Sequence, residues 1–299
     1  MASVVVLGSF NMDLVVQAEI LPTPGETVLG HSFTRGPGGK GSNQAIAARR
    51  LGANVCFIGA VGEDEFGTAA RQLHLTEGID VSGLAVVPAP TGVALIVVNA
   101  DAENQIAVAS GANMLLTPAM VRGNEGAIAA ADVFLAQLET PVEAFIEAAD
   151  IAHRHDTTVI LNPAPAVELD GRVFQHVDVI TPNQHELLAL AGVENPEWAA
   201  TALAKRGTSL DIVVTNGPFG ATWTGPRGAQ RFPAVRADAV DTTGAGDAFN
   251  AGLAVGMAEH ETIEAGIALG LRAGAFAITQ VGVIDGLATR EQLDYAFAD

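Results

Sequence analysis

Residues 133–161 read VFLAQLETPVEAFIEAADIAHRHDTTVIL and contain two short apolar runs separated by a stretch of helical length. The runs Val133–Ala136 and Thr158–Leu161 have the length and composition of buried strands, and Pro141–His155 between them is long enough for a helix. Similar runs occur upstream at Ser3–Gly8 and downstream at Ile212–Thr215. Strands that alternate with helices of about 10–15 residues indicate βαβ units, so the pattern predicts an α/β fold with a parallel sheet.

Two segments interrupt this alternation, at residues 13–37 and 91–110. Each contains short extended pieces, and Pro22, Pro24 and Gly25 break up the first of them. Such pieces are typical of antiparallel strands joined by turns. We therefore predict that residues 1–299 form one α/β domain and that the two insertions form a small β-sheet beside its core.

The composition excludes several classes of protein. The 299 residues include 34 acidic and 15 basic ones, which gives a formal net charge of −19. A nucleic-acid binder, or a protein held on anionic lipid, needs a basic face, so neither class fits. The hydrophobic fraction of 49% favours a folded core, yet no window of about 18 residues is apolar enough to span a membrane. Cys56 is the only cysteine, which excludes an intrachain disulfide and cysteine-based zinc sites, and we expect a cytoplasmic protein.

The segment Asp241-Thr-Thr-Gly-Ala-Gly-Asp247 has the composition of an anion-binding turn at the start of a helix. The small residues Gly244, Ala245 and Gly246 let backbone N–H groups point at a ligand, and a helix N-terminus favours negative charge. An acidic Asp247 suits such a site as a base that takes a proton from a hydroxyl attacking phosphorus. The alternative is a glycine-containing loop in which Asp247 is only a first-turn acid.

The run Gly36-Pro-Gly-Gly-Lys-Gly41 matches the G-x-G-x-x-G spacing of dinucleotide-binding loops, with Glu63 and Asp64 near the distance of a ribose-binding acid. It follows irregular extended chain and not the first strand, so the context of a dinucleotide site is missing. A flexible hinge between the small sheet and the core is another interpretation. Lys40 is one of only two lysines, and its place in a glycine loop indicates binding of an anion or a hydroxyl, although a solvated lysine also fits.

Polar side chains follow the ends of several predicted strands, where α/β sheets bind ligands. Asn11 and Asp13 come after the first strand, Asn43 follows the glycine loop, and Glu139 follows Val133–Ala136. Together with the amine of Lys40 they supply the donors and acceptors that a polyhydroxyl compound needs. Each of them alone also fits a turn or a helix cap.

Helix caps account for other polar residues. Asn183 and Glu186 have the N-x-x-E spacing of an N-cap with its capping-box acid. Ser42 is expected to cap an alanine-rich helix over Ser42–Leu51. The motifs Asn162-Pro-Ala-Pro165 and Thr181-Pro-Asn183 also lie at strand ends.

Six segments together resemble the ribokinase-like carbohydrate kinase family over essentially the whole chain and in the family order. They are Asn11-Met-Asp13, Gly38-Gly-Lys-Gly-Ser-Asn-Gln44, Gln137-Leu-Glu139, Asn162-Pro-Ala-Pro165, Thr181-Pro-Asn-Gln-His-Glu186 and Asp241-Thr-Thr-Gly-Ala-Gly-Asp247. The resemblance implies a three-layer α/β/α core with a small β-sheet lid, which often serves as a homodimer interface. It also implies in-line phosphoryl transfer from ATP to the 5-hydroxyl of D-ribose, with Mg²⁺ and a monovalent cation, K⁺, as cofactors.

The same resemblance implies a role for individual residues. The sugar would contact Asn11, Asp13, Gly39, Lys40, Asn43, Glu139 and the general base Asp247. The transferring phosphoryl group would meet an anion hole made by Gly244, Ala245 and Gly246. The nucleotide would meet Asn183, Glu186, Thr215, Gly217, Gly220 and Gly246, with Mg²⁺ held through water by Glu186. The monovalent cation would lie near Asp241, Thr243, Ala277 and Gly282.

The chain departs from the family pattern at Pro218, Leu271 and Gly286, which stand where polar residues are common in the family. Alternatives to the ribose kinase also follow from the residues. Within the family, deoxyribose, fructose or adenosine is the rival substrate. Outside it, the rivals are an NAD(P)-dependent oxidoreductase that uses Gly36–Gly41 and a catalytically silent sugar-binding regulator.

Overall fold

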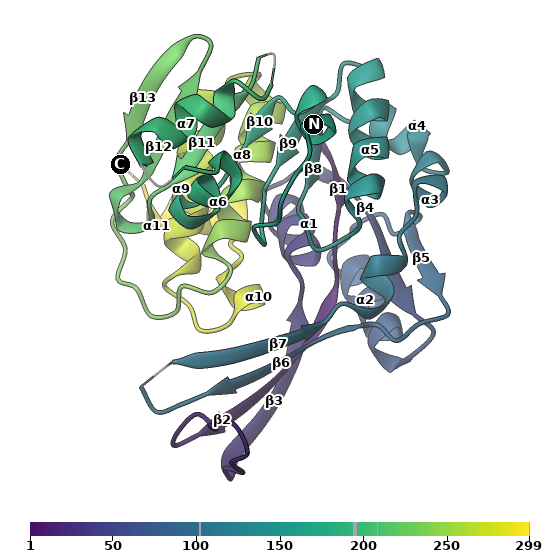
Figure 1. The fold of residues 1–299 in the computed structure, drawn as a ribbon, viewed down its shortest axis with the longest axis vertical. Helices are drawn as coiled ribbons and strands as arrows, with labels where there is room; N and C mark the ends of the chain where they lie inside the picture. The colour runs from purple at the N-terminus through teal and green to yellow at the C-terminus, as the bar shows by residue number, and fades with distance from the viewer. Residues whose placement is uncertain (102, 194–195, 208, 299) are drawn as a thin grey trace.

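A nine-stranded sheet forms the centre of the computed structural model, which describes residues 1–101, 103–193, 196–207 and 209–298 (Figure 1). The strand order is β13-β12-β11-β10-β9-β8-β1-β4-β5. All neighbours pair in parallel except β11–β12 and β12–β13, which are antiparallel. The strands are β1 (Ser3–Leu7), β4 (Asn54–Gly62), β5 (Leu84–Val87), β8 (Val133–Ala136), β9 (Thr158–Leu161), β10 (Val179–Ile180), β11 (Asp211–Thr215), β12 (Ala221–Gly225) and β13 (Gly228–Phe232).

Helices cover both faces of this sheet. Side chains alternate along a strand, so Val4 and Val6 of β1 enter one apolar cluster, whereas Val5 and Leu7 enter the other. The first cluster includes α1 (Lys40–Arg50), α2 (Glu65–Thr76), α8 (Ala245–His260), α9 (Ile263–Ala277), α10 (Val283–Gly286) and α11 (Arg290–Ala296). The second includes α3 (Pro118–Arg122), α4 (Glu125–Ala129), α5 (Val142–Arg154), α6 (Gln184–Ala191) and α7 (Pro196–Ala204). The three-layer α/β/α core predicted from the sequence is confirmed.

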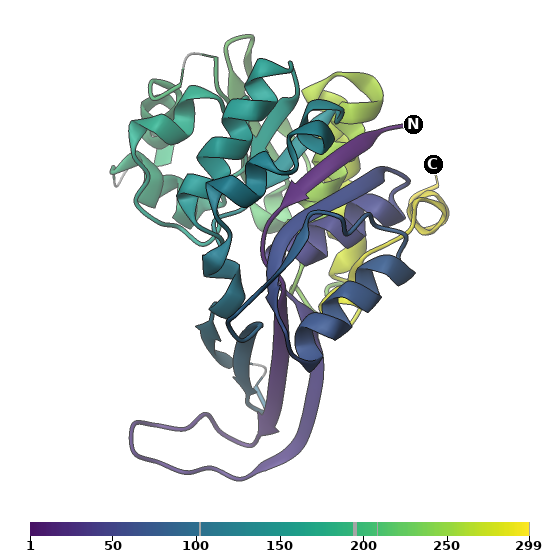
Figure 2. The same cartoon turned by 90° about the vertical axis from the view of Figure 1, so that its right-hand side faces the viewer.

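A second sheet of four strands extends away from the core (Figures 1 and 2). It has the order β3-β2-β6-β7, from β2 (Asn11–Ala18), β3 (Gly30–Gly38), β6 (Gly92–Val98) and β7 (Asn104–Ala109). The pairs β2–β3 and β6–β7 are antiparallel hairpins, and the parallel pair β2–β6 joins them. We call this sheet the lid. It is the small β-sheet that the two insertions predicted.

Helix α1 begins two residues earlier than predicted. Its N-cap is Gly39, whose φ of 90° places the backbone in the left-handed region that favours glycine. Ser42 lies inside the helix with its side chain fully buried, and its backbone N–H donates to the carbonyl of Ser9 at 2.9 Å. The expectation that Ser42 caps the helix is therefore wrong, because close packing against the β1–β2 connection sets the helix start.

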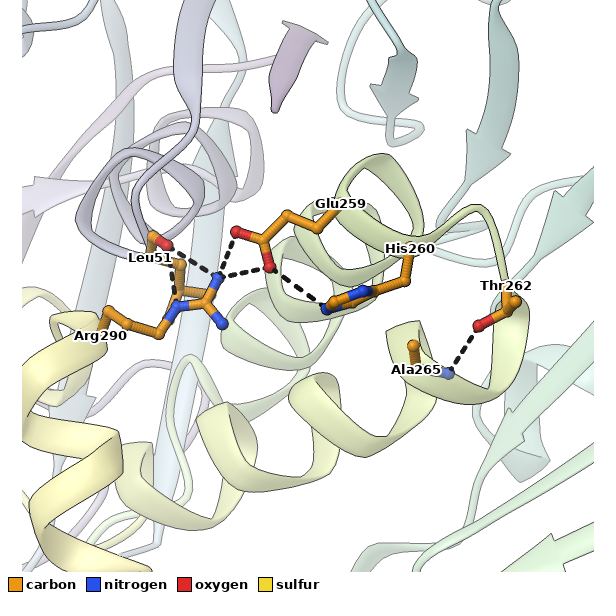
Figure 3. A network of polar contacts seen from close by, with 6 residues as sticks. All are labelled: Leu51, Glu259, His260, Thr262, Ala265 and Arg290. Carbon is orange, nitrogen blue, oxygen red and sulfur yellow. Dashed lines mark hydrogen bonds and ion pairs between the residues drawn. The ribbon is translucent and has the colours of Figure 1, made fainter. Parts of the chain in front are cut away.

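The C-terminal helix α11 ties together the ends of α1 and α8 (Figure 3). The Arg290 guanidinium donates to the carbonyl of Leu51, at the end of α1, over 3.0–3.1 Å. It also donates to both carboxylate oxygens of Glu259 in α8, at 2.8 and 2.9 Å. Nearby, Oε2 of Glu259 lies 3.9 Å from Nε2 of His260. The Thr262 hydroxyl accepts the backbone N–H of Ala265 and so caps α9. Helices α1 and α8 begin at the two glycine motifs, so this contact holds their opposite ends together.

Within the described residues, none of the helices has both the length and the hydropathy needed to cross a membrane.

Candidate active site

Asp247 is a buried carboxylate in the first turn of α8. Gly244 is the N-cap of this helix, with a φ of 80°, and Asp247 is only 6% exposed. Its Oδ2 accepts from Asn43 Nδ2 at 2.9 Å, and its Oδ1 accepts from Gln44 Nε2 at 3.0 Å. Burial raises the pKa of Asp247, while the charge of Lys40 and the two amide donors oppose that rise. The Asp247 carboxylate is therefore shielded from water, held in one orientation and more basic than the carboxylate of a surface aspartate.

The turn before Asp247 has an open side. A Cβ atom added to Gly246 would meet no atom within 4 Å, whereas one on Gly244 would lie 2.7 Å from a methyl carbon of Val283. The N–H of Ala245 donates to the carbonyl of Thr242 at 3.3 Å. The start of a 16-residue helix therefore faces open space at Gly246, which is the geometry of an anion site.

The glycine loop before α1 packs against the β1–β2 connection. A Cβ atom on Gly39 would lie 2.7 Å from the nitrogen of Asn11, the first residue of β2, and one on Gly41 would lie 2.5 Å from the nitrogen of Ser9. The backbone N–H of Lys40 donates to Glu139 Oε2 at 3.0 Å, and the Ser9 hydroxyl donates to the same oxygen. The glycines thus allow two backbones to approach closely, and they bring Lys40 to the end of β8.

Asn11 and Asp13 stand where the lid leaves the core. Asn11 is 4% exposed, and its Oδ1 accepts from Asn113 Nδ2 at 2.9 Å. Asn113 also pairs with both the N–H and the carbonyl of Phe10, each at 3.0 Å. Burial and, to a lesser degree, the charge of Glu139 raise the pKa of Asp13 to about 6. The structure therefore brings the predicted sugar contacts together with Asp247 at the carboxyl ends of the core strands.

Most of the predicted nucleotide contacts lie at the start of α6, at the end of β11 and in the turn after it. Asn183 caps α6 and forms a capping box with Glu186, at 2.9 and 2.8 Å, which confirms the predicted cap. Asn183 also bridges to Thr215 at the end of β11. Burial raises the pKa of Glu186, and Lys40 is one of the groups that oppose that rise, so the two sites share one electrostatic environment. The turn after β11 holds two more of the predicted residues, the positive-φ glycines Gly217 and Gly220.

Two of the predicted cation residues, Thr243 and Gly282, contact Asp241. Its Oδ1 accepts from the N–H and hydroxyl of Thr243, and its Oδ2 accepts from the N–H of Gly282. Partial burial acts to raise the pKa of Asp241, but these donors outweigh it and lower the pKa. A Cβ atom on Gly286 would lie 2.9 Å from the carbonyl oxygen of Ala277. No cluster of three or more His, Cys, Asp or Glu side chains in the described part of the chain has the arrangement of a metal site.

Three residues of this site were not assigned a role from the sequence. They are Ser9, Gln44 and Asn113, and all three are buried. Gln44 stands in the glycine motif, so its position was visible, but its partner Asp247 is 203 residues away. Asn113 follows the second lid hairpin, and a polar residue beside apolar neighbours was the only signal for it.

The comparison with protein families matches residues 1–290 to the family model described as pfkB family carbohydrate kinase. The chain belongs to the pfkB family of carbohydrate kinases. This carbohydrate kinase is 40% identical over 296 residues to a ribokinase of Bacillus subtilis (strain 168), covering 98% of this chain and 99% of the relative. It is 34% identical over 298 residues to a deoxyribokinase of Salmonella typhi, covering 97% of each.

Among solved structures, this carbohydrate kinase is similar to an Arabidopsis thaliana ribokinase complexed with ribose and ATP. The TM-score is 0.90, the sequences are 30% identical, and 98% of each chain is covered. The oxidoreductase alternative is therefore wrong. Its loop, Gly36–Gly41, spans the end of lid strand β3 and the start of α1, and its candidate acid Asp64 caps α2 and accepts from Thr91. The kinase is a phosphotransferase of the ribokinase type.

Proposed function

We propose that this carbohydrate kinase transfers the terminal phosphoryl group of ATP to the 5-hydroxyl of D-ribose. The observation that carries the proposal is the buried Asp247 carboxylate behind the open start of helix α8. A helix N-terminus attracts the phosphoryl group, and a carboxylate beside it accepts the proton of the attacking hydroxyl. Ribose and ATP are the choice because the Bacillus subtilis relative is a ribokinase and the Arabidopsis structure holds both molecules.

The sugar would be held by residues from both sides of the lid connection. Oδ1 of Asn11 already accepts a hydrogen bond from Asn113. The amide N–H groups of Asn11 are therefore the ones that would donate to a sugar hydroxyl. Oδ1 of Asn43 is buried and has no partner in the described part of the chain, and a sugar hydroxyl would satisfy it. The further contacts proposed are Asp13, Gly39, Lys40 and Glu139. Closure of the lid over them would exclude water, which competes with the sugar for the phosphoryl group.

The chemical step is an in-line displacement at the terminal phosphorus. The 5-hydroxyl oxygen forms the new bond to phosphorus, the bond to the bridging oxygen of ATP breaks, and ADP leaves with that electron pair. Asp247 takes the hydroxyl proton as the bond forms. The backbone N–H groups of Gly244 and Gly246 stabilise the charge on the transferring group, and that of Ala245, which donates to the Thr242 carbonyl in this structure, would have to turn to the phosphoryl group to join them.

The nucleotide would lie along Asn183, Glu186, Thr215, Gly217, Gly220 and Gly246. One oxygen of Glu186 accepts the N–H of Asn183, and its second oxygen suits a water-mediated contact to Mg²⁺. Magnesium in kinases is commonly held by one or two carboxylates plus phosphate oxygens, so a single carboxylate fits. When bound, Mg²⁺ neutralises charge on the phosphates.

A monovalent cation would be held by Asp241, Thr243, Ala277 and Gly282. The donor set is a carboxylate with backbone and hydroxyl oxygens, which suits a hard cation such as K⁺. Because Asp241 lies three residues before Gly244, a cation there would fix the anion hole without touching either substrate.

We also propose that the kinase is a homodimer whose subunits meet through the lid. The register places Asp13, Val15 and their neighbours Ile96, Ile106 and Val108 on one lid face. Ile106 and Val108 are 55% and 52% exposed, which leaves an apolar surface beside the sugar site. A second copy of the lid would cover it.

The relative from Salmonella typhi makes 2-deoxyribose the second candidate substrate. Release of ADP should be measured with ribose, deoxyribose, fructose and adenosine, and the phosphorylated position should be assigned by NMR. Ribose should have the highest kcat/KM and carry phosphate on the 5-oxygen, because a pocket that binds the 2-hydroxyl rejects the sugar that lacks it. A preference for another compound overturns the ribose assignment. Absence of ADP release with every compound would likewise overturn the ribose assignment.

A further inference from the structure

Five buried polar side chains connect Asp247 to the ends of the central strands. We call them the amide network: Gln44, Gln137, Asn162, Thr181 and Asn250. Gln44 is at its centre, since its Nε2 donates to Asp247 Oδ1 at 3.0 Å and to Asn162 Oδ1 at 3.2 Å. Its Oε1 accepts from Gln137 Nε2 at 2.6 Å. All three groups of the Gln44 amide are thereby committed to neighbours inside the protein.

The amide network returns to helix α8. Asn162 Nδ2 donates to the carbonyl of Thr181 at 3.2 Å, and the Thr181 hydroxyl donates to Asn250 Oδ1 at 2.5 Å. Asn250 Nδ2 then donates to the carbonyl of Gly246 at 2.8 Å. One end of the network therefore holds the side chain of Asp247, and the other end holds the backbone of the preceding residue.

The cost of burying this network indicates that it has a role. Its members are between 0% and 6% exposed. A buried amide costs free energy unless it is hydrogen-bonded, and apolar side chains of similar size would fill the same space at lower cost. The strand-end motifs that begin with Asn162 and Thr181 supply two of the members. These motifs thus anchor the base to the carboxyl ends of β9 and β10 from inside the protein.

We propose that Gln44 is a positioning residue that holds the carboxylate plane of Asp247 in the orientation that meets the sugar hydroxyl. The inference rests on the proposed function, in which Asp247 is the general base. Gln44 and Asn43 each hold one carboxylate oxygen, so rotation of the carboxylate would break both contacts. The charged groups that face Asp247 are Lys40 and Glu139, of opposite sign, and Gln44 adds a neutral donor to the charged form.

The test replaces Gln44 by methionine, which has a similar length but no N–H donor. In Gln44→Met we expect kcat at pH 7 to fall about 10- to 100-fold, because the base loses one donor and its orientation. We expect the acidic limb of the kcat–pH profile to move to higher pH by about one unit, because the charged form loses a hydrogen bond. The KM for ribose should change less than about threefold. Gln137→Met, one step further away, should give a smaller change in the same direction and serves if Gln44→Met does not fold.

The matched control is Thr157→Val, which removes a buried hydroxyl that donates to the carbonyl of Ile128 in the apolar cluster on the other face of the sheet. Its pH profile should be that of the parent. Asp247→Asn separates the two proposals. If Asp247→Asn keeps normal kcat, the general base is misassigned. If it loses activity while Gln44→Met and Gln137→Met keep the kcat and acidic limb of the parent, the positioning role alone is wrong.

Discussion

At the scale of single residues, the burial of Asp247 determines the chemistry we propose. Asp247→Asn keeps the shape of the side chain and an oxygen that can accept from Asn43, but it removes the base. The kcat should therefore fall about 10²- to 10⁴-fold. Ribose affinity, measured by calorimetry, should change far less. Asp178→Asn is the control, because the Asp178 carboxylate accepts the backbone N–H of Val159 at the other ends of the strands, away from the site. Near-normal kcat in Asp247→Asn would remove Asp247 from the mechanism.

Gly246 tests the anion hole without a confounding loss of stability. A Cβ atom there meets nothing in the protein, and alanine favours a helix over glycine by about 1 kcal/mol, so the melting temperature of Gly246→Ala should not fall. The added methyl group would occupy the space proposed for the phosphoryl group, so kcat should fall at least about tenfold. Gly126→Ala, at an equally open helical position in α4, should leave kcat unchanged. Equal activity of both variants would place the phosphoryl group elsewhere.

Asp13 predicts a pH dependence of sugar binding. Its pKa of about 6 means that the carboxylate is charged above pH 6 and protonated below it. Because a charged carboxylate accepts from hydroxyl groups better than the neutral acid, the KM for ribose should rise as the pH falls through 6, by about tenfold per unit once Asp13 is protonated. In Asp13→Asn, KM should be higher and this dependence should disappear. Initial-rate measurements between pH 5 and 8 test this dependence. A KM for ribose that does not change with pH in the parent would contradict the role of Asp13 in sugar binding.

At the scale of elements, the glycine run Gly36–Gly41 shows how one pattern serves different purposes. Its spacing fits a dinucleotide loop, but in the fold Gly39 and Gly41 accommodate the neighbouring β1–β2 connection. The same close approach moves the start of α1 to Lys40 and leaves Ser42 without a capping role. The capping box of Asn183 and Glu186 was predicted correctly because its partners are three residues apart. Local geometry decides the capping box, whereas packing against residues distant in the sequence decides where α1 begins.

The loop that carries Asp241 predicts activation by a monovalent cation. Replacing Na⁺ by K⁺ at constant ionic strength should raise activity, mainly through kcat, because the cation would fix the anion hole and touch neither substrate. Ionic strength is held constant because a chain of charge −19 responds to screening alone. Asp241→Asn should lose the difference between the two ions. Equal rates in Na⁺, K⁺ and tetramethylammonium would show that the loop holds no functional cation.

At the scale of the whole molecule, the exposed lid face predicts a dimer. Light scattering after gel filtration should give twice the chain mass of 30.6 kDa. Ile106→Lys places a charge on the proposed interface and should shift the protein toward the monomer. Val86→Lys, at an equally exposed valine of the core sheet, should keep the parent mass. A parent that runs as a monomer at every concentration would leave the lid face without its proposed partner.

The sequence by itself determined the α/β class, the small second sheet and the order of the motifs, because strand and helix periodicity, turns and caps depend on residues only a few positions apart. The family resemblance grouped the motifs around one sugar, but only the tertiary structure decided which side chains contact one another. Asn43 and Asp247 are 204 residues apart, and Asn11 and Asn113 are 102 apart. No local pattern encodes such contacts, since they arise only when the parallel strands bring their carboxyl ends to one edge of the sheet. The same packing buries Asp247 and Gln44 together, and burial is what changes a first-turn acid into the base we propose.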